Sequence, residues 1–360
     1  MEALQADYPW VKSPLVSCAP MRLIALAPLA VAVSAAGGLG FIGAGSDVSF
    51  LEAELEKTKS LLSSLSSPLT TSDGTLPVGV GFLCWGLKPT DVTPLISQPG
   101  SRPAAIWLFA PRDLAHFAEW STEIRKVTEG QTKVWIQVGT VAEALTSVEY
   151  AKPDVLVIQG QDAGGHGLTH GSGLVPFLPE AIAAVTKLCA EKGIKKPSFI
   201  ATGGIMEGKG VAAALTLGAH GVCLGTKFLA AEEATLAQGY RDSVIRARDG
   251  GVSTVRSSVY DTLRGTTQWP GHYGGRGVIN ASYEDWEKGM PVEENKKLYE
   301  EAVKKGDEGW DESKGRLTAY AGTGVGLVDK IQKAEEIVRE AREGAAEALR
   351  TAWESVQHRT

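Results

Sequence analysis

One loop of the sequence combines a titratable ring with a flexible, glycine-rich backbone. Residues 159–167 read QGQDAGGHG and directly follow the apolar run 155–158. An imidazole has an ordinary pKa of about 6.5, so it can take up a proton at neutral pH. His166 is therefore the candidate general base, and Asp162 is a candidate to orient it or to act as an alternative base. His170, in the same loop, is a weaker candidate.

Two further glycine-rich loops have the composition of anion-binding turns. Residues 201–205 read ATGGI and residues 225–228 read GTKF; each loop follows a short apolar run. We expect a helix from about residue 208 and another directly after residue 228. Glycine lets the backbone approach a ligand closely, and free N–H groups at the start of a helix attract an anion. The residues alone are compatible with a phosphate-bearing cofactor and with two plain strand-to-helix turns.

The elements that must position these loops are short and continuously apolar. Eight such runs occur, at residues 14–19, 39–42, 77–82, 105–109, 134–138, 155–158, 199–201 and 221–224. Continuous apolar character is typical of parallel strands covered on both faces. Helical patterns alternate with the runs, and one helix is expected to open at Thr140, an N-cap with Glu143 in the capping-box position.

Eight strand–helix units of this size predict an α/β fold, a (β/α)8 TIM barrel, which needs about 250 residues. An open doubly wound sheet is the structural alternative. In a barrel the active site lies at the carboxyl ends of the strands, where the three glycine-rich loops occur.

The sequence changes character after residue 247. Residues 248–315 are rich in Gly, Trp, Tyr and charged residues, and only 292–305 has a helical pattern. We expect three parts: the barrel at 12–247, an insertion or lid region at 248–315 that forms part of the substrate pocket, and a C-terminal helical segment at 316–357 that packs back on the barrel. Within the last part, a helix is expected over 329–353, with Ile331 on its apolar face.

Composition and motifs exclude several classes of protein. The net charge of −6, with 43% hydrophobic residues, argues against a disordered chain and against a basic nucleic-acid binder. The four cysteines form no C-x-x-C pair, so no metal site or disulfide framework is indicated, and a reducing, cytoplasmic location is expected. Arg22, Pro20 and Pro28 interrupt the longest apolar stretch, so no membrane span is expected.

Taken together, these loops resemble those of the nitronate monooxygenase family, once called 2-nitropropane dioxygenases. The resemblance covers nearly the whole chain and is carried by CAPM at 18–21, AAGGLG at 35–40, the loops 159–167, 201–205 and 225–228, and GTGVG at 322–326. The A-G-G-H element after a strand, combined with the later G-G-I and G-T-x-F, is specific. Residues 260–280 look like the fungal-type members.

The resemblance implies an FMN-dependent barrel enzyme with assigned residues. Backbone N–H groups of the glycine-rich loops would hold the FMN phosphate, and the flavin ring would lie near residues 19–21. The implied cofactor-binding residues are Ala19, Pro20, Met21, Gln137, Gln159, Gly164, Gly165, Gly203, Gly204, Gly225 and Thr226. His166 would be the catalytic base, which removes the proton α to a nitro group or positions the nitronate, and the cofactor would supply the electron chemistry.

The implied function is FMN-dependent oxidative denitrification of alkyl nitronates or nitroalkanes with O₂. The implied partners are that small-molecule substrate and O₂, with no nucleic acid and no membrane. The Ala-rich terminal helix is compatible with packing inside the subunit or between copies in a homo-oligomer.

Two other functions stay open at this point. An FMN- and NAD(P)H-dependent enoyl reductase-like oxidoreductase would have the same barrel and phosphate loops. A non-catalytic barrel that binds a phosphate ligand is the second alternative, and the intact A-G-G-H loop argues against it.

Overall fold

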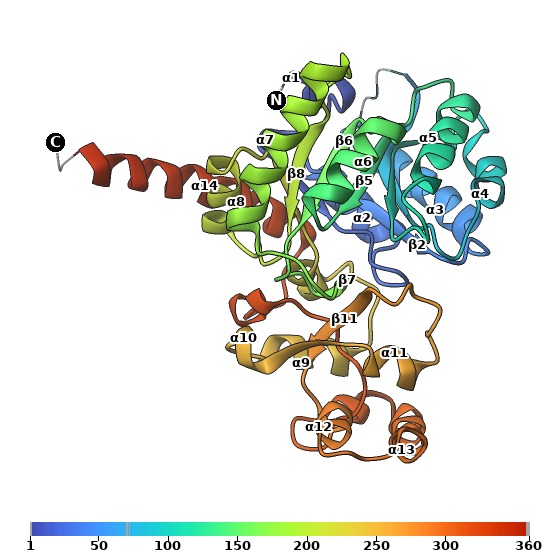
Figure 1. Cartoon of the computed structure of the whole chain (residues 1–360), viewed down its shortest axis with the longest axis vertical. Helices are drawn as coiled ribbons and strands as arrows, with labels where there is room; N and C mark the ends of the chain where they lie inside the picture. Colours follow the sequence, from blue (N-terminus) through green and yellow to red (C-terminus); the bar gives the residue numbers. More distant parts are fainter. Residues whose placement is uncertain (1, 70, 72, 358–360) are drawn as a thin grey trace.

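A computed structural model describes residues 2–69, 71 and 73–357 of the chain. Eight parallel strands curl into a nearly closed barrel (Figure 1). They are β1 (Leu15–Cys18), β2 (Phe41–Gly45), β3 (Leu76–Leu83), β4 (Pro103–Phe109), β5 (Lys133–Val138), β6 (Val155–Gln159), β8 (Ser198–Thr202) and β9 (Gly221–Leu224). Strand β9 pairs with β1, and two backbone hydrogen bonds between Leu39 and β1 bring the two ends of the sheet together. The predicted (β/α)8 TIM barrel is confirmed, with all eight predicted strands.

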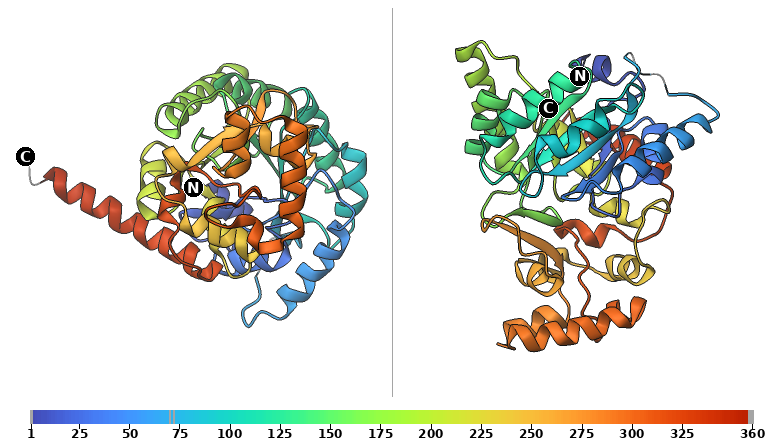
Figure 2. Two further views of the ribbon diagram at one scale, coloured as in Figure 1. Left: turned by 90° about the horizontal axis from the view of Figure 1, so that it is seen from below. Right: turned by 90° about the vertical axis from the view of Figure 1, so that its right-hand side faces the viewer.

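A ring of helices covers the outside of the barrel (Figure 2). Its members are α2 (Ala27–Ala35), α3 (Leu51–Ser63), α4 (Pro89–Ile96), α5 (His116–Val127), α6 (Val141–Ala151), α7 (Leu174–Lys192) and α8 (Gly208–Thr216). The predicted N-cap of α6 is present, because Thr140 Oγ1 accepts a hydrogen bond from the Glu143 N–H at 3.1 Å. The strands are therefore buried on both faces, which explains their continuously apolar sequences.

Aromatic side chains fill the amino end of the barrel. Helix α1 (Glu2–Asp7) leads into Tyr8, which is fully buried and whose hydroxyl accepts a hydrogen bond from Trp135 Nε1 at 2.7 Å. Trp135 stacks on Trp107 with the ring centroids 5.8 Å apart, and Phe41 packs edge-on against both rings. The barrel interior is thus a packed core at this end, which leaves only the carboxyl end for a ligand.

A second, three-stranded antiparallel sheet stands at that carboxyl end. It consists of β7 (Gly165–Leu168), β11 (Tyr273–Val278) and β10 (Thr254–Ser257), with β11 in the middle. The other elements of this region are η1 (Thr226–Ala230), α9 (Gln238–Arg246), α10 (Gly250–Ser253), α11 (Val259–Arg264), α12 (Ala281–Glu287), α13 (Val292–Lys304), η2 (Gly306–Trp310) and η3 (Thr323–Leu327). Residues 248–315, here called the cap, lie together below the barrel in Figure 1. Of the cap elements, α13 matches the predicted helix at 292–305.

Two helix predictions are wrong in their position. Residues 226–230 form the short 3₁₀ helix η1, so no α-helix follows directly after residue 228, and α9 begins only at Gln238. The terminal helix α14 (Ala334–Gln357) begins later than residue 329, and Ile331 lies outside it with 40% of its surface exposed. The cause is a β-bridge: the Gln332 N–H donates to Ala230 O and the Glu232 N–H donates to Gln332 O, which keeps this stretch extended.

Helix α14 packs on α8 with its first half. Ile337, Val338, Ala341 and Ala345 are buried, and Gly344 lies directly against Gly208 of α8. The end of α14 extends away from the barrel (Figure 1). None of the helices in the described part of the chain combines the length and the apolar character that a bilayer span needs.

We expect Tyr8→Phe to lower the free energy of unfolding by about 1–3 kcal/mol, because it leaves the buried Trp135 N–H without an acceptor. Urea unfolding followed by tryptophan fluorescence measures the change. Tyr150→Phe is the matched control, since Tyr150 is 62% exposed, and should stay within about 0.5 kcal/mol of the parent. Equal stability of the two variants would contradict the role given to the Tyr8–Trp135 bond.

Candidate active site

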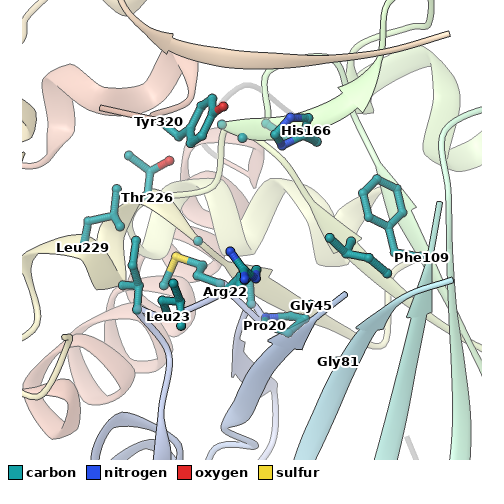
Figure 3. Close-up of a pocket in the computed structure, with 18 of the residues that line it drawn as sticks. Pro20, Arg22, Leu23, Gly45, Gly81, Phe109, His166, Thr226, Leu229 and Tyr320 are labelled. Atoms are coloured by element: carbon teal, nitrogen blue, oxygen red, sulfur yellow. The ribbon is translucent and has the colours of Figure 1, made fainter. Parts of the chain in front are cut away.

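A cavity of about 760 Å³ opens between the carboxyl ends of the barrel strands and the cap. This volume is within the usual range of ligand pockets. The twelve residues to which the resemblance gives a role all line this one cavity: Ala19, Pro20, Met21, Gln137, Gln159, Gly164, Gly165, His166, Gly203, Gly204, Gly225 and Thr226. In Figure 3, His166 and Tyr320 lie on one side of the cavity, and Pro20, Arg22 and Leu23 lie on the opposite side.

The loops after β8 and β9 offer unpaired N–H groups to the cavity. Gly203 and Gly204 have φ angles of +105° and +76°, a backbone region that favours glycine. A Cβ at Gly203 would lie 2.8 Å from Gly160 O, so the close approach of the two loops also requires glycine. Within residues 2–69, 71 and 73–357, the N–H groups of Gly203, Gly204 and Gly225 have no acceptor. These donors can therefore bind an anion.

The segment that returns from the cap supports these loops from behind. The Gly322 N–H donates to Thr226 Oγ1 at 3.0 Å, and the Thr323 N–H donates to Asp162 O at 3.0 Å. A Cβ at Gly164 would lie 2.4 Å from the Gly322 nitrogen, so only glycine allows the two backbones to touch. The motif at residues 322–326 thus packs directly against the glycine-rich loops after β6 and β9.

The prediction that Asp162 orients His166 is wrong. Asp162 Oδ1 accepts a hydrogen bond from Thr323 Oγ1 at 2.7 Å and serves the packing just described. The carboxylate that faces the imidazole is Asp261 of α11, whose two oxygens both lie 2.9 Å from His166 Nε2. His170 is exposed and does not line the cavity.

His166 is enclosed by groups from the cap and from the segment after it. Its ring stacks on Trp269 with the centroids 3.8 Å apart and the planes 4° from parallel, and Tyr320 lies at 5.2 Å on a tilt. The side chain of His166 is 13% exposed and that of Asp261 is 8% exposed. The imidazole is therefore almost removed from solvent and still borders the cavity.

Two hydroxyl groups complete the surroundings of Asp261. Thr266 Oγ1 and Tyr320 Oη donate to the same oxygen, Oδ1, at 2.9 and 3.2 Å. Burial raises the pKa of Tyr320 well above its ordinary value, and the negative charge of Asp261 adds to this effect. The phenol thus stays protonated and remains a donor. Sequence reasoning missed Asp261 because it lies 95 residues from His166, in a segment without clear periodicity.

A partly buried arginine holds the loop that leads into β7, the strand that carries His166. The Arg256 guanidinium on β10 donates to four backbone carbonyls, those of Gln161, Ala163, Gly165 and Gly274, at 2.7 to 3.3 Å. Burial, together with the smaller effect of the charge of Arg276, lowers the pKa of Arg256 to about 10. Because that value is still well above neutrality, the guanidinium stays charged, and its carbonyl bonds are of the strong, charge-assisted kind.

The remaining polar groups of the cavity limit its chemistry. Gln137 Oε1 accepts from Trp107 Nε1 at 3.0 Å, so its amide NH₂ is left as a donor, while Gln159 Nε2 donates to His166 O at 3.1 Å.

Burial raises the pKa of the Cys223 thiol to about 12, so it stays protonated and is a poor nucleophile. Over the described residues, no group of three or more His, Cys, Asp or Glu side chains is placed to hold a metal ion. The arrangement is suited to anion binding and proton transfer.

Comparison with known proteins gives a consistent result. The family model "Nitronate monooxygenase" matches residues 115–343. "Nitronate monooxygenase npaC" of Metarhizium robertsii is 44% identical over 353 residues, 97% of this chain and 95% of that protein. "Nitronate monooxygenase" of Neurospora crassa is 37% identical over 367 residues, 96% and 93% of the two chains.

Solved structures share the fold at low sequence identity. FabK from Thermotoga maritima superposes with a TM-score of 0.72 at 21% identity, over 98% of each chain. A nitroalkane oxidase from Streptomyces ansochromogenes superposes with a TM-score of 0.69 at 22% identity, over 98% of this chain and 99% of that one. At this identity the likeness supports the barrel fold alone.

We expect Arg256→Met to loosen the loop at residues 160–167, because four carbonyls lose their charged donor. Amide hydrogen exchange in this loop should become at least about tenfold faster, which corresponds to about 1.4 kcal/mol of local stability. Arg350→Met is the control, since Arg350 lies on the surface of α14, where it pairs with Glu347. Unchanged exchange in the Arg256 variant would contradict the anchoring role.

Proposed function

The chain belongs to the nitronate monooxygenase family, and from this premise we propose that it is an FMN-dependent enzyme that oxidises alkyl nitronates, or nitroalkanes by way of their nitronates, with O₂. The observation that carries the proposal is the single cavity in which unpaired backbone donors and a carboxylate-paired imidazole occur together. A non-catalytic phosphate-binding barrel would have no use for the second feature.

The residues present fit FMN. The free N–H groups of Gly203, Gly204 and Gly225 match a phosphate group, and the Gln137 amide offers a donor to a polar ring edge. Pro20 supplies an apolar wall against Gly81, where a Cβ would lie 2.3 Å from Pro20 Cβ. These residues, with Ala19, Met21, Gly164, Gly165, Gln159 and Thr226, would hold the cofactor, and bound FMN would supply the redox and O₂ chemistry.

The cavity is also suited to an anionic substrate. A nitronate carries a negative charge, and Arg22 and Arg264 are cationic side chains on the cavity wall. Both side chains are exposed, so their charge would attract an anion from solvent toward the cavity. Trp269 and Phe109 add aromatic surface, which keeps water away from the reacting carbon.

His166 performs the proton transfer in this proposal. With a neutral nitroalkane, the imidazole removes the proton on the carbon next to the nitro group, and the resulting imidazolium stays paired with Asp261. With a preformed nitronate the proton is already absent, so the ring only helps to position the anion. A cytoplasmic location and a homo-oligomer stay predictions.

The test of the function is anaerobic mixing followed at flavin wavelengths. We expect the purified protein to carry flavin absorbance that survives desalting, a nitronate to bleach that absorbance, and NADPH to leave it unchanged. Rapid bleaching by NADPH, without bleaching by a nitronate, would replace this proposal with the enoyl reductase-like alternative.

We expect His166→Asn to lower turnover of neutral nitroalkanes by about 10²-fold or more while FMN stays bound, because the base is lost. Turnover of preformed nitronates should fall much less. Steady-state oxygen consumption with each substrate measures the difference. His170→Asn, outside the cavity, is the control, and full nitroalkane activity of His166→Asn would remove the catalytic role from this residue.

A further inference from the structure

The contact between Asp261 and His166 fixes where a neutral imidazole carries its proton. An ionised carboxylate can only accept hydrogen bonds. Both oxygens of Asp261 lie 2.9 Å from the same ring nitrogen, Nε2. A hydrogen bond at this position therefore requires the proton on Nε2, and in the neutral ring Nδ1 then carries the lone pair.

The ring has little freedom to reverse this arrangement. The parallel stack with Trp269 covers one face of the imidazole. The backbone of His166 is held in β7 opposite Gly275 of β11, and its carbonyl accepts from Gln159 Nε2. A 180° rotation of the ring about the Cβ–Cγ bond would place a carbon atom at the position of Nε2, so Asp261 would lose its hydrogen-bond partner.

The other ring nitrogen is open. Nδ1 has no hydrogen-bond partner within the part of the chain that the structure describes, and it is not fully buried. It therefore retains accessible surface on a side chain that borders the cavity. An unpaired lone pair in contact with the substrate space is what a general base needs.

We propose that Asp261 is a positioning residue that holds the proton of neutral His166 on Nε2 and so makes Nδ1 the basic atom. The role of Nδ1 as the base rests on the function proposed above. The C–H bond next to the nitro group breaks and its proton forms a bond with Nδ1. The electron pair forms the C=N bond of the nitronate, and the negative charge goes to the nitro oxygens. Nε2 keeps its proton and its bond to Asp261 throughout.

Asp261→Asn tests this directly. Thr266 and Tyr320 both donate to Oδ1, so the amide oxygen of the asparagine is expected at that position and the amide nitrogen at the position of Oδ2. The amide would then donate to Nε2 and force the proton of the neutral ring onto Nδ1. In the Ser-His-Asp triad of serine proteases, a tautomer reversed in this way lowers turnover by about 10⁴-fold.

The first measurement is ¹⁵N NMR of the full-length protein with labelled histidine, recorded at alkaline pH, above the ordinary pKa of an imidazole. The His166 signals are assigned by their loss in His166→Asn. We expect a directly bonded proton on Nε2 in the parent and on Nδ1 in Asp261→Asn. A parent ring with its proton on Nδ1, a ring that stays doubly protonated, or an unchanged tautomer in the variant would each overturn the proposal.

The second measurement compares two substrates. For Asp261→Asn we expect kcat/KM to fall by about 10²–10⁴-fold with a neutral nitroalkane and by less than about tenfold with its preformed nitronate. Equal losses with both substrates would indicate a structural role and overturn the proposal. Asp242→Asn, on the surface of α9 beside Gln238, is the matched control. If the parent oxidises neither substrate, the proposed function fails, and the NMR measurement still decides the tautomer.

Discussion

The antiparallel pairing of β7 with β11 is the interaction on which the site depends. Strand β7 follows β6 of the barrel, whereas β11 belongs to the cap, so the ladder joins two parts of the chain more than a hundred residues apart. It sets His166 opposite Gly275 and brings β10, with Arg256, to the loop before β7. Without this ladder the barrel would still have its glycine-rich loops, but His166 would lack both its carboxylate and its stacking partner.

Glycines allow the close approach that this pairing requires. A Cβ at Gly275 would lie 2.6 Å from the ring of Tyr320, and one at Gly277 would lie 2.9 Å from Ala319 O. The segment that carries Tyr320 can therefore lie directly on β11 and bring the phenol to Asp261. Larger residues in this strand would separate the cap from the segment behind it, and the hydroxyl that binds Asp261 would move away.

The sequence was sufficient for the barrel and for half of the site. Buried parallel strands have continuous apolar runs, and glycine pairs after them mark the loops, so His166 and Gly203 could be found from local pattern. Strand β11 could not be predicted, because YGGRGV has the glycine content of a loop and gains its stability from pairing alone. No local sequence pattern marks Asp261 and Trp269 as site residues, because they reach His166 only when the cap, about a hundred residues later in the chain, packs against it. Asp162 was predicted to orient His166 because it is close to it in the sequence, but its carboxylate accepts a hydrogen bond from Thr323 instead.

The guanidinium of Arg256 explains how the loop between β6 and β7 is held in place although it has no helical geometry. Desolvating a cation without a paired carboxylate is costly, and the four carbonyl bonds offset this cost. A trans peptide group directs its C=O and its N–H in opposite directions. Since Arg256 draws the Ala163 carbonyl to one side, the N–H of Gly164 in the same peptide group is directed to the other side, and Gly164 borders the cavity. Arg256 thus fixes the orientation of this peptide group, although the sequence places no helix directly after the strand-six loop.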